Sequence, residues 1–273
     1  MKKRITFKTW IFILISSLCL AVLTISLINI FYWTKDSLNT KKIVKEINNN
    51  IEIETKEDNE KTEIINKPLD TNNDYWYYIT FPFIEVNINE LKKKNNDTIG
   101  WINVNNTNIN YPIVQANDNE YYLNHSYNKK ANNAGWIFLD YRNNNNFTDK
   151  NNIIYGHSRV DKTMFATLLD TLNYNWYSNK DNHIIRLSLE KENYLYQIFS
   201  VYKIPTESYY ITTKFSNDKE YQEFIDTIKK RSIYDFNTDI NIKDNILTLS
   251  TCYDDDNRTV VHAKLIKKQD KNN

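Results

Sequence analysis

The fold is decided by residues 246–266, which read ILTLSTCYDDDNRTVVHAKLI. Two runs with the alternating apolar pattern of β-strands flank residues 253–257, which are rich in Asp and Asn. Two such runs joined by a short polar connection predict a β-hairpin. In this hairpin Cys252 ends the first strand and Arg258 opens the second, so their side chains can meet near its turn.

The hairpin ends a region in which short runs of Trp, Tyr, Phe, Ile and Val alternate with Asn/Asp clusters from residue 75 onward. This pattern is typical of a β-rich domain, and residues 75–273 have the size of one domain. The predicted strands cover residues 100–104, 108–114, 135–139, 152–155, 183–189, 195–203, 245–251 and 259–266. Eight short strands of this kind predict a closed, mainly β barrel.

Three helices are predicted beside the strands. Asn87 is a helix-capping residue with Glu90 three positions on, as in a capping box. Residues 162–172 and 218–231 carry apolar side chains at helical spacing, which indicates helices that pack on the core. The last helix falls between the sixth and seventh predicted strands.

The N-terminus carries a membrane signal. Residues 10–33 form 24 residues without a charge, long enough at about 1.5 Å per residue to cross a hydrocarbon core of about 30 Å. Basic residues within positions 1–9 predict a cytoplasmic N-terminus and an external remainder. The alternative is a cleaved signal peptide, but the apolar run is longer than usual and no small-x-small cleavage site follows.

Residues 34–74 connect this segment to the domain. They are rich in Lys, Glu, Asn and Thr and contain few aromatic residues. We expect a flexible stalk with a root-mean-square reach of roughly 35 Å. Such a stalk would hold the domain near the membrane.

The charge balance and the cysteine count exclude several classes of protein. Lys and Arg number 35 against 34 Asp and Glu, so the chain lacks the strongly basic character of a nucleic-acid-binding domain. Of the two cysteines, Cys19 lies in the apolar run, which leaves Cys252 without a disulfide partner in the exported domain. A leftover exported thiol is a candidate reactive group, although a buried core cysteine is the alternative.

Positive neighbours such as Arg258 favour a thiolate, and the guanidinium could also stabilise an oxyanion. A cysteine nucleophile usually needs a histidine to exchange protons. His157 is favoured, because it follows the apolar run IIY and Gly156 at a strand end. His262 is expected to face solvent or a neighbouring helix, and His183 to lie at the surface. His125, in a predicted turn, is the weaker candidate.

These residues form a pattern that resembles the class B sortases. It consists of NNIIYGH at 151–157, LTLSTC at 247–252 and Arg258, in this order behind a membrane segment. The resemblance extends over about 190 residues and includes GWINV at 100–104, NYPIVQANDNEYYL at 110–123 and GWIFLDYRN at 135–143. The helix before the final strands resembles the insertion between the sixth and seventh strands of that class.

The resemblance implies a membrane-tethered cysteine transpeptidase of a Gram-positive cell surface. Cys252 would attack the carbonyl of the Thr in a secreted protein's C-terminal sorting motif, and His157 would protonate the departing nitrogen. Arg258 would bind the motif and stabilise the oxyanion. The thioester would be released by an amine of the peptidoglycan precursor or of another protein, and no metal or organic cofactor is implied.

The resemblance also implies where the motif binds. The matching positions are Asn119, Leu123, Tyr210, Ile211 and Ser250. Class resemblance favours an Asn-Pro-x-Thr or Ser-Pro-x-Thr motif over Leu-Pro-x-Thr. The acceptor amine, and the resting protonation state of the Cys252 and His157 pair, stay open.

Other readings compete with this one. An L,D-transpeptidase also places a His before a Cys, but its motif has Arg two residues after the nucleophile, where Asp254 stands here. Papain-like wall hydrolases have the opposite order of Cys and His. A membrane-anchored binding protein with a structural Cys252 is the non-enzymatic alternative.

Overall fold

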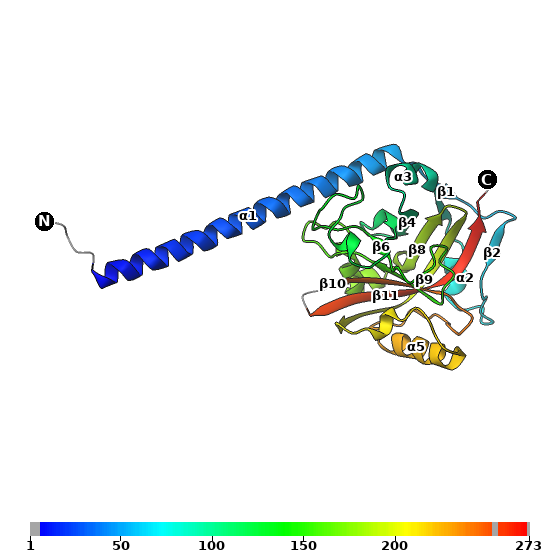
Figure 1. Cartoon of the computed structure of the whole chain (residues 1–273). Helices are drawn as coiled ribbons and strands as arrows, with labels where there is room; N and C mark the ends of the chain where they lie inside the picture. Colours follow the sequence, from blue (N-terminus) through cyan, green and yellow to red (C-terminus); the bar gives the residue numbers. More distant parts are fainter. Residues whose placement is uncertain (1–5, 253–255, 272–273) are drawn as a thin grey trace.

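The computed structural model describes residues 6–252 and 256–271 of the chain (Figure 1). The helices among these residues are α1 (Phe7–Asn50), α2 (Tyr75–Tyr78), α3 (Ile88–Lys94), α4 (Tyr174–Tyr177) and α5 (Asp218–Lys230), with the 3-10 helices η1 (Tyr121–Leu123), η2 (Ala166–Leu172), η3 (Lys180–His183) and η4 (Tyr209–Ile211). The strands are β1 (Ile53–Lys56), β2 (Thr62–Ile64), β3 (Phe83–Val86), β4 (Thr98–Val104), β5 (Asn110–Val114), β6 (Phe138–Leu139), β7 (Asn151–Tyr155), β8 (Ile184–Leu189), β9 (Glu192–Pro205), β10 (Ile246–Cys252) and β11 (Asn257–Asp270).

Strands β4 to β11 form a closed barrel. They hydrogen-bond in the order β10-β7-β6-β5-β4-β8-β9-β11, and the pairing of β10 with β11 closes the circle. Each predicted strand overlaps one strand of this barrel, so the closed eight-stranded barrel predicted from the sequence is confirmed. Helix α5 lies between β9 and β10, the sixth and seventh barrel strands, as predicted.

Alternation along β10 explains how the barrel builds two cores. Leu247 and Leu249 join the main cluster of buried residues, while Ile246 joins a second cluster with the apolar side of α5. Because successive side chains of a strand point to opposite faces, one strand serves both layers. The amphipathic stripe predicted for α5 is confirmed, since Tyr221, Phe224, Ile225 and Ile228 are buried.

The other two predicted helices fare differently. Asn87 caps α3 as expected, with its Oδ1 accepting from the Glu90 backbone N–H at 3.3 Å. Residues 162–172 contain the 3-10 helix η2 and no α-helix. Lys162 and Met164 both have positive φ, 62° and 55°, which interrupts a right-handed helix before η2 begins.

The structure differs from the flexible stalk expected over residues 34–74. Helix α1 continues without a break from the apolar run to Asn50, and its last turns bury Ile47 against the domain. Strand β1 then pairs with β3, and β2 extends the sheet beside β11. The composition of this segment is polar, but its few apolar and hydroxyl side chains meet partners that are distant in the sequence.

Two histidines away from the predicted site are buried. His183 was expected at the surface, and this expectation is wrong: its ring lies 2.7 Å from the Tyr78 hydroxyl and 2.8 Å from the Tyr177 carbonyl. Burial lowers the pKa of His183 to about 4. His262 faces a neighbouring helix, as one of its two expected placements had it, and lies near Phe224 of α5. Burial lowers the pKa of His262 to about 3.

Candidate active site

The strand register brings three predicted site residues to one edge of the barrel. Cys252 lies opposite Arg258 in the antiparallel pair of β10 and β11. Strand β7 runs parallel to β10 with Ser250 opposite Tyr155, two residues before Cys252 and His157 respectively. The backbones of Cys252, His157 and Arg258 therefore meet at the end of three adjacent strands. Of the predicted turn at 253–257, residues 253–255 lie outside the described part of the chain, and Asn257 already belongs to β11.

Among the described residues, the His157 ring makes one hydrogen bond. Its Nε2 lies 2.8 Å from the backbone carbonyl of Leu123. Because a carbonyl oxygen only accepts hydrogen bonds, Nε2 carries the hydrogen and Nδ1 is the nitrogen that can gain and lose a proton. The backbone carbonyl of His157 accepts from the Phe165 N–H at 2.9 Å, which fixes the start of the following loop.

Gly135 makes room for this histidine, a role that sequence reasoning did not assign. Its φ is +60°, and a methyl group on its Cα would lie 2.8 Å from the Leu123 carbonyl and 2.9 Å from His157 Cδ2. Any side chain would therefore be strained and would push on the imidazole. The available signal was that Gly135 is one of only 3 glycines in the chain.

Arg258 sits between two strands at the start of β11. It is paired with Cys252 on one side and with Ile204 of β9 on the other. Its Nη1 donates to the Asn257 carbonyl at 2.9 Å, and the residue is partly exposed. A guanidinium at this edge places positive charge beside the strand end that carries Cys252.

Two of the predicted substrate-binding residues touch each other directly. The Tyr210 hydroxyl lies 3.1 Å from Ser250 Oγ, and both side chains are buried. Ile211, the next residue of η4, is partly exposed. The segment η4 thus packs over the β10 face that leads to Cys252.

Asp140 supports the region around η4 through hydrogen bonds, and sequence reasoning did not single it out. Its fully buried carboxylate accepts five hydrogen bonds, from Arg142 N, Nε and Nη2, the Tyr155 hydroxyl and Asn119 Nδ2, at 2.7 to 3.0 Å. Arg142 Nη2 also donates to the Ile211 carbonyl at 3.0 Å. Asp140 therefore connects Asn119 to Ile211, which are 92 residues apart in the sequence.

The Asp140 carboxylate stays ionised in the folded state. Burial alone would raise the pKa of Asp140, but the hydrogen bonds from Arg142 and Tyr155 outweigh it, so the pKa lies below its usual value. Burial and the nearby Asp140 charge raise the pKa of Tyr155. The pair stays an ionised carboxylate and a neutral phenol that donates to it.

A second network of hydrogen bonds supports η4 from the barrel side. Asn151 Nδ2 donates to the carbonyls of Tyr210 and Thr212 at 3.1 and 2.9 Å. Its Oδ1 accepts from Thr248, whose hydroxyl is 2.8 Å from His262 Nδ1. The buried His262 thus serves this structural network and is separated from the edge that carries Cys252 and His157.

The remaining predicted residues have separate roles in the geometry. Asn119 uses both ends of its amide, since Oδ1 accepts from the Tyr141 N–H at 3.0 Å while Nδ2 binds Asp140. The Leu123 side chain is 40% exposed, and its carbonyl is the partner of His157. Leu123 therefore lies where the predicted binding residues meet the edge that carries His157.

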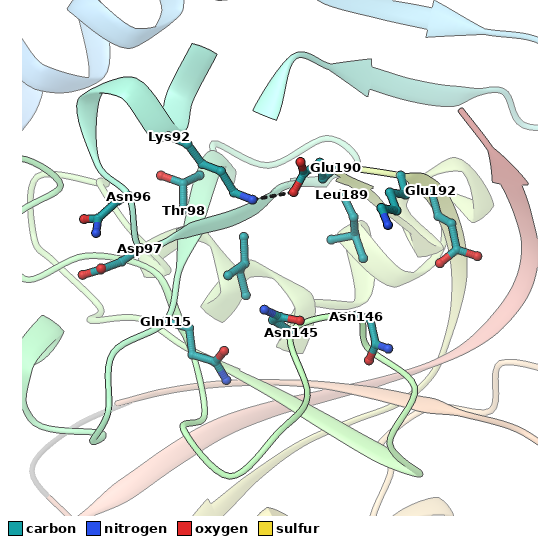
Figure 2. Close-up of a pocket in the computed structure, with 12 residues that line it drawn as sticks. Lys92, Asn96, Asp97, Thr98, Gln115, Asn145, Asn146, Leu189, Glu190 and Glu192 are labelled. Atoms are coloured by element: carbon teal, nitrogen blue, oxygen red, sulfur yellow. Dashed lines mark hydrogen bonds and ion pairs between the residues drawn. The ribbon is translucent and has the colours of Figure 1, made fainter. Parts of the chain in front are cut away.

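Two hollows differ in their relation to these residues. One, of about 650 Å³, is lined by Arg142, Ile211 and the segment after η4. Another, of about 540 Å³, is shown in Figure 2 with Lys92 bonded to Glu190, and none of the predicted site residues lines it. Among the described residues, no group of three or more His, Cys, Asp or Glu side chains is placed to hold a metal ion.

Comparison with known proteins gives a consistent result. A Sortase domain model matches residues 102–266. Sortase B of Listeria monocytogenes is 40% identical over 189 residues, 66% of this chain and 74% of the relative. Sortase B of Staphylococcus aureus is 40% identical over 181 residues, 65% and 73% of the two chains. The solved Staphylococcus aureus sortase B-substrate complex superposes with a TM-score of 0.62 at 39% identity, covering 66% of this chain and 84% of that one.

Proposed function

The chain belongs to the sortase family of cysteine transpeptidases, in class B, and we propose that it transfers secreted proteins to an amine through a thioester on Cys252. The observation that carries this proposal is the register of β7, β10 and β11, which brings Cys252, His157 and Arg258 to one edge. A thioester conserves acyl-transfer potential and divides one amide exchange into two easier steps.

Each of the three residues has a role in this proposal. The Cys252 thiolate attacks the carbonyl carbon of the motif's Thr, a C–S bond forms, and the amide C–N bond breaks. His157 gives a proton to the departing nitrogen and later takes one from the incoming amine. The Arg258 guanidinium donates to the oxyanion and to the motif. The Leu123 contact leaves Nδ1 of His157 as the nitrogen for these transfers.

The motif binds along the groove beside η4. This proposed groove includes the hollow lined by Arg142 and Ile211, and its further binding positions are Ser250, Tyr210, Asn119 and Leu123. The Asp140 hydrogen bonds connect Asn119 to Ile211 before substrate arrives. The motif is of the Asn-Pro-x-Thr or Ser-Pro-x-Thr type. The partners are secreted proteins that carry it near the C-terminus and an amine of the peptidoglycan precursor.

Residues 10–33 of α1 are the membrane anchor. Among the described residues, α1 is long and apolar enough to cross a bilayer, and its apolar window is fully exposed in the isolated chain. The basic residues before it favour a cytoplasmic N-terminus. The barrel then lies on the outer surface, where its substrates are secreted.

Incubation of the full chain in nanodiscs with peptides of the three motif types tests the proposal. Triglycine and an Nα-blocked lysine serve as amine acceptors, and Cys252→Ala is the control. We expect cleavage after Thr and a product joined to the amine for the Asn-Pro-x-Thr or Ser-Pro-x-Thr peptides, and none with the variant. Cleavage that persists in Cys252→Ala would contradict the proposed mechanism. Selective turnover of the Leu-Pro-x-Thr peptide would contradict the proposed motif.

A further inference from the structure

Helix α1 reaches beyond the apolar run and contacts the loop before Gly135. This first loop comprises residues 124–135. Asn132 Nδ2 donates to the Asp36 carbonyl and to Thr40 Oγ1, both at 3.2 Å. The backbone N–H and the side-chain amide of Asn133 both donate to Asp36 Oδ2, again at 3.2 Å. Four hydrogen bonds therefore fasten one turn of α1 to this loop.

The same turn of α1 holds the loop after His157. This second loop comprises residues 158–163. The buried Ser37 hydroxyl donates to Asp161 Oδ2, while Asp161 Oδ1 accepts from the Thr163 hydroxyl at 2.6 Å. Trp33 lies with its ring 5.6 Å from the Arg159 guanidinium, a cation–π contact. One face of α1 thus touches both loops.

The two loops are the ones that hold the catalytic imidazole. The first loop is bounded by the Leu123 carbonyl, which binds His157 Nε2, and by Gly135, where a methyl group on Cα would lie 2.9 Å from His157 Cδ2. The second loop follows His157 directly, and just after it the Phe165 N–H donates back to the His157 carbonyl at 2.9 Å. A shift of either loop would move the ring.

Arg159 makes the second loop depend on the helix. Its side chain is only 7% exposed, and its Nε and Nη2 have no hydrogen-bond partner among the described residues. Its ionic partner is Asp161, with Nε 3.5 Å from Oδ1. A buried charge with incomplete hydrogen bonding is costly, so the Trp33 ring and the Asp161 pair, which Ser37 orients, keep this loop in place.

We infer that residues 33–40 of α1 act as a brace that positions His157. The helix that forms the membrane anchor thereby holds the catalytic histidine in place. The expected effect of the brace on catalysis rests on the proposed function of His157. The contacts of the brace with the two loops do not depend on that proposal. Asp36, Ser37, Arg159 and Asp161 are positioning residues in this view. They act through the two loops and do not touch the substrate.

The test compares two variants of the full chain in nanodiscs. Asp36→Ala/Ser37→Ala removes the two hydrogen bonds from Asn133 to the Asp36 carboxylate and the bond from Ser37 to Asp161, while Leu38→Ala/Lys41→Ala changes exposed positions of the same helix. Hydrogen–deuterium exchange should accelerate in segments 123–136 and 156–166 of the first variant, with α5 unchanged, and should stay as in the parent chain in the second. Unchanged exchange in both loops would overturn the inference, whatever the activity of the chain.

Kinetics supply the second readout. The substrate is a sorting-motif peptide that the parent chain cleaves. Asp36→Ala/Ser37→Ala should lower kcat about tenfold and keep KM within about twofold of the parent value, because a small misplacement of a catalytic group lowers the rate more than it weakens binding. Asp36→Asn keeps an acceptor oxygen for Asn133 and should retain most of kcat. Faster exchange of both loops with an unchanged kcat would overturn the positioning role. If the parent chain turns over no peptide, the proposed function fails, and hydrogen exchange alone decides on the brace.

Discussion

The proposed groove beside η4 meets the proposed catalytic edge, which carries Cys252, His157 and Arg258, at Ser250. The two regions are built in different ways. In the groove, one buried carboxylate accepts five hydrogen bonds, and Tyr210 and Ser250 are buried against each other. At the edge, His157 is partly exposed, and its ring makes one hydrogen bond among the described residues, with the Leu123 carbonyl at 2.8 Å. The groove is shaped by its own side chains, whereas His157 and Arg258 at the edge are partly exposed, and His157 depends on neighbouring loops for its position.

The largest expected effect separates chemistry from stability. His157→Gln should lower kcat about 10³-fold, within the range found for loss of general acid–base catalysis. Because Gln can still donate to the Leu123 carbonyl and the residue is partly exposed, the free energy of unfolding should change by less than about 0.5 kcal/mol. Peptide turnover and urea unfolding measure the two quantities. A loss of stability as large as that expected for Asp140→Ala, described next, would contradict the distinction between the catalytic edge and the groove.

Asp140→Ala should have the opposite profile. It leaves Arg142, Tyr155 and Asn119 without their common acceptor, and because Arg142 is exposed, the cost is that of partly buried donors that lose a partner, about 2 kcal/mol of stability. KM for the motif peptide should rise more than kcat falls, because Asn119 and η4 lose their connection. Asp226→Asn on the exposed side of α5 is the control. A stable variant with unchanged KM would show that the groove does not depend on this carboxylate.

Buried histidines extend the comparison to pH. The pKa of His183 is lowered to about 4 in the folded state, so between pH 6.5 and about 4 the unfolded chain binds more protons. Stability should therefore fall as pH decreases through this window, by up to about 3 kcal/mol for this residue. Urea unfolding of the parent chain and of His183→Gln at several pH values measures the difference in slope. Equal slopes would mean that His183 is not held neutral.

The smallest effect tests the groove alone. Tyr210→Phe removes the hydroxyl that lies 3.1 Å from Ser250 Oγ and should cost about 1 kcal/mol of stability. KM should rise a few-fold with kcat nearly constant, since the catalytic edge is untouched. Tyr174→Phe, at a position that is 67% exposed, is the matched control. A fall in kcat without a change in KM would assign Tyr210 to the catalytic edge instead.

The sequence predicted the barrel because alternation is local. Each predicted strand overlaps an observed one, and Cys252 opposite Arg258 followed from the hairpin pattern alone. The resemblance to class B sortases supplied Tyr210 and Ser250, which the structure brings into contact. No local pattern near either residue would have paired them.

The features that could not be predicted from the sequence depend on contacts between segments that are distant in the chain. Asp140 sits in the stretch GWIFLDYRN, where nothing indicates that its carboxylate will meet Asn119 and Tyr155. The polar composition of residues 34–74 suggested a flexible stalk, but Asp36 and Ser37 find partners about 100 residues later. His183 follows a polar turn, and its burial is decided by Tyr78 and Tyr177.

The most direct test of the account is to trap the acyl group on Cys252. The full chain in nanodiscs is mixed with an Asn-Pro-x-Thr peptide without acceptor, quenched in acid and analysed by intact-protein and peptide mass spectrometry. The account predicts a mass gain equal to the peptide portion ending at Thr, located on Cys252, absent in Cys252→Ala, and lost when an amine is added before quenching. Peptide cleavage after Thr with no adduct on Cys252, under conditions in which His157→Gln is inactive, would contradict it.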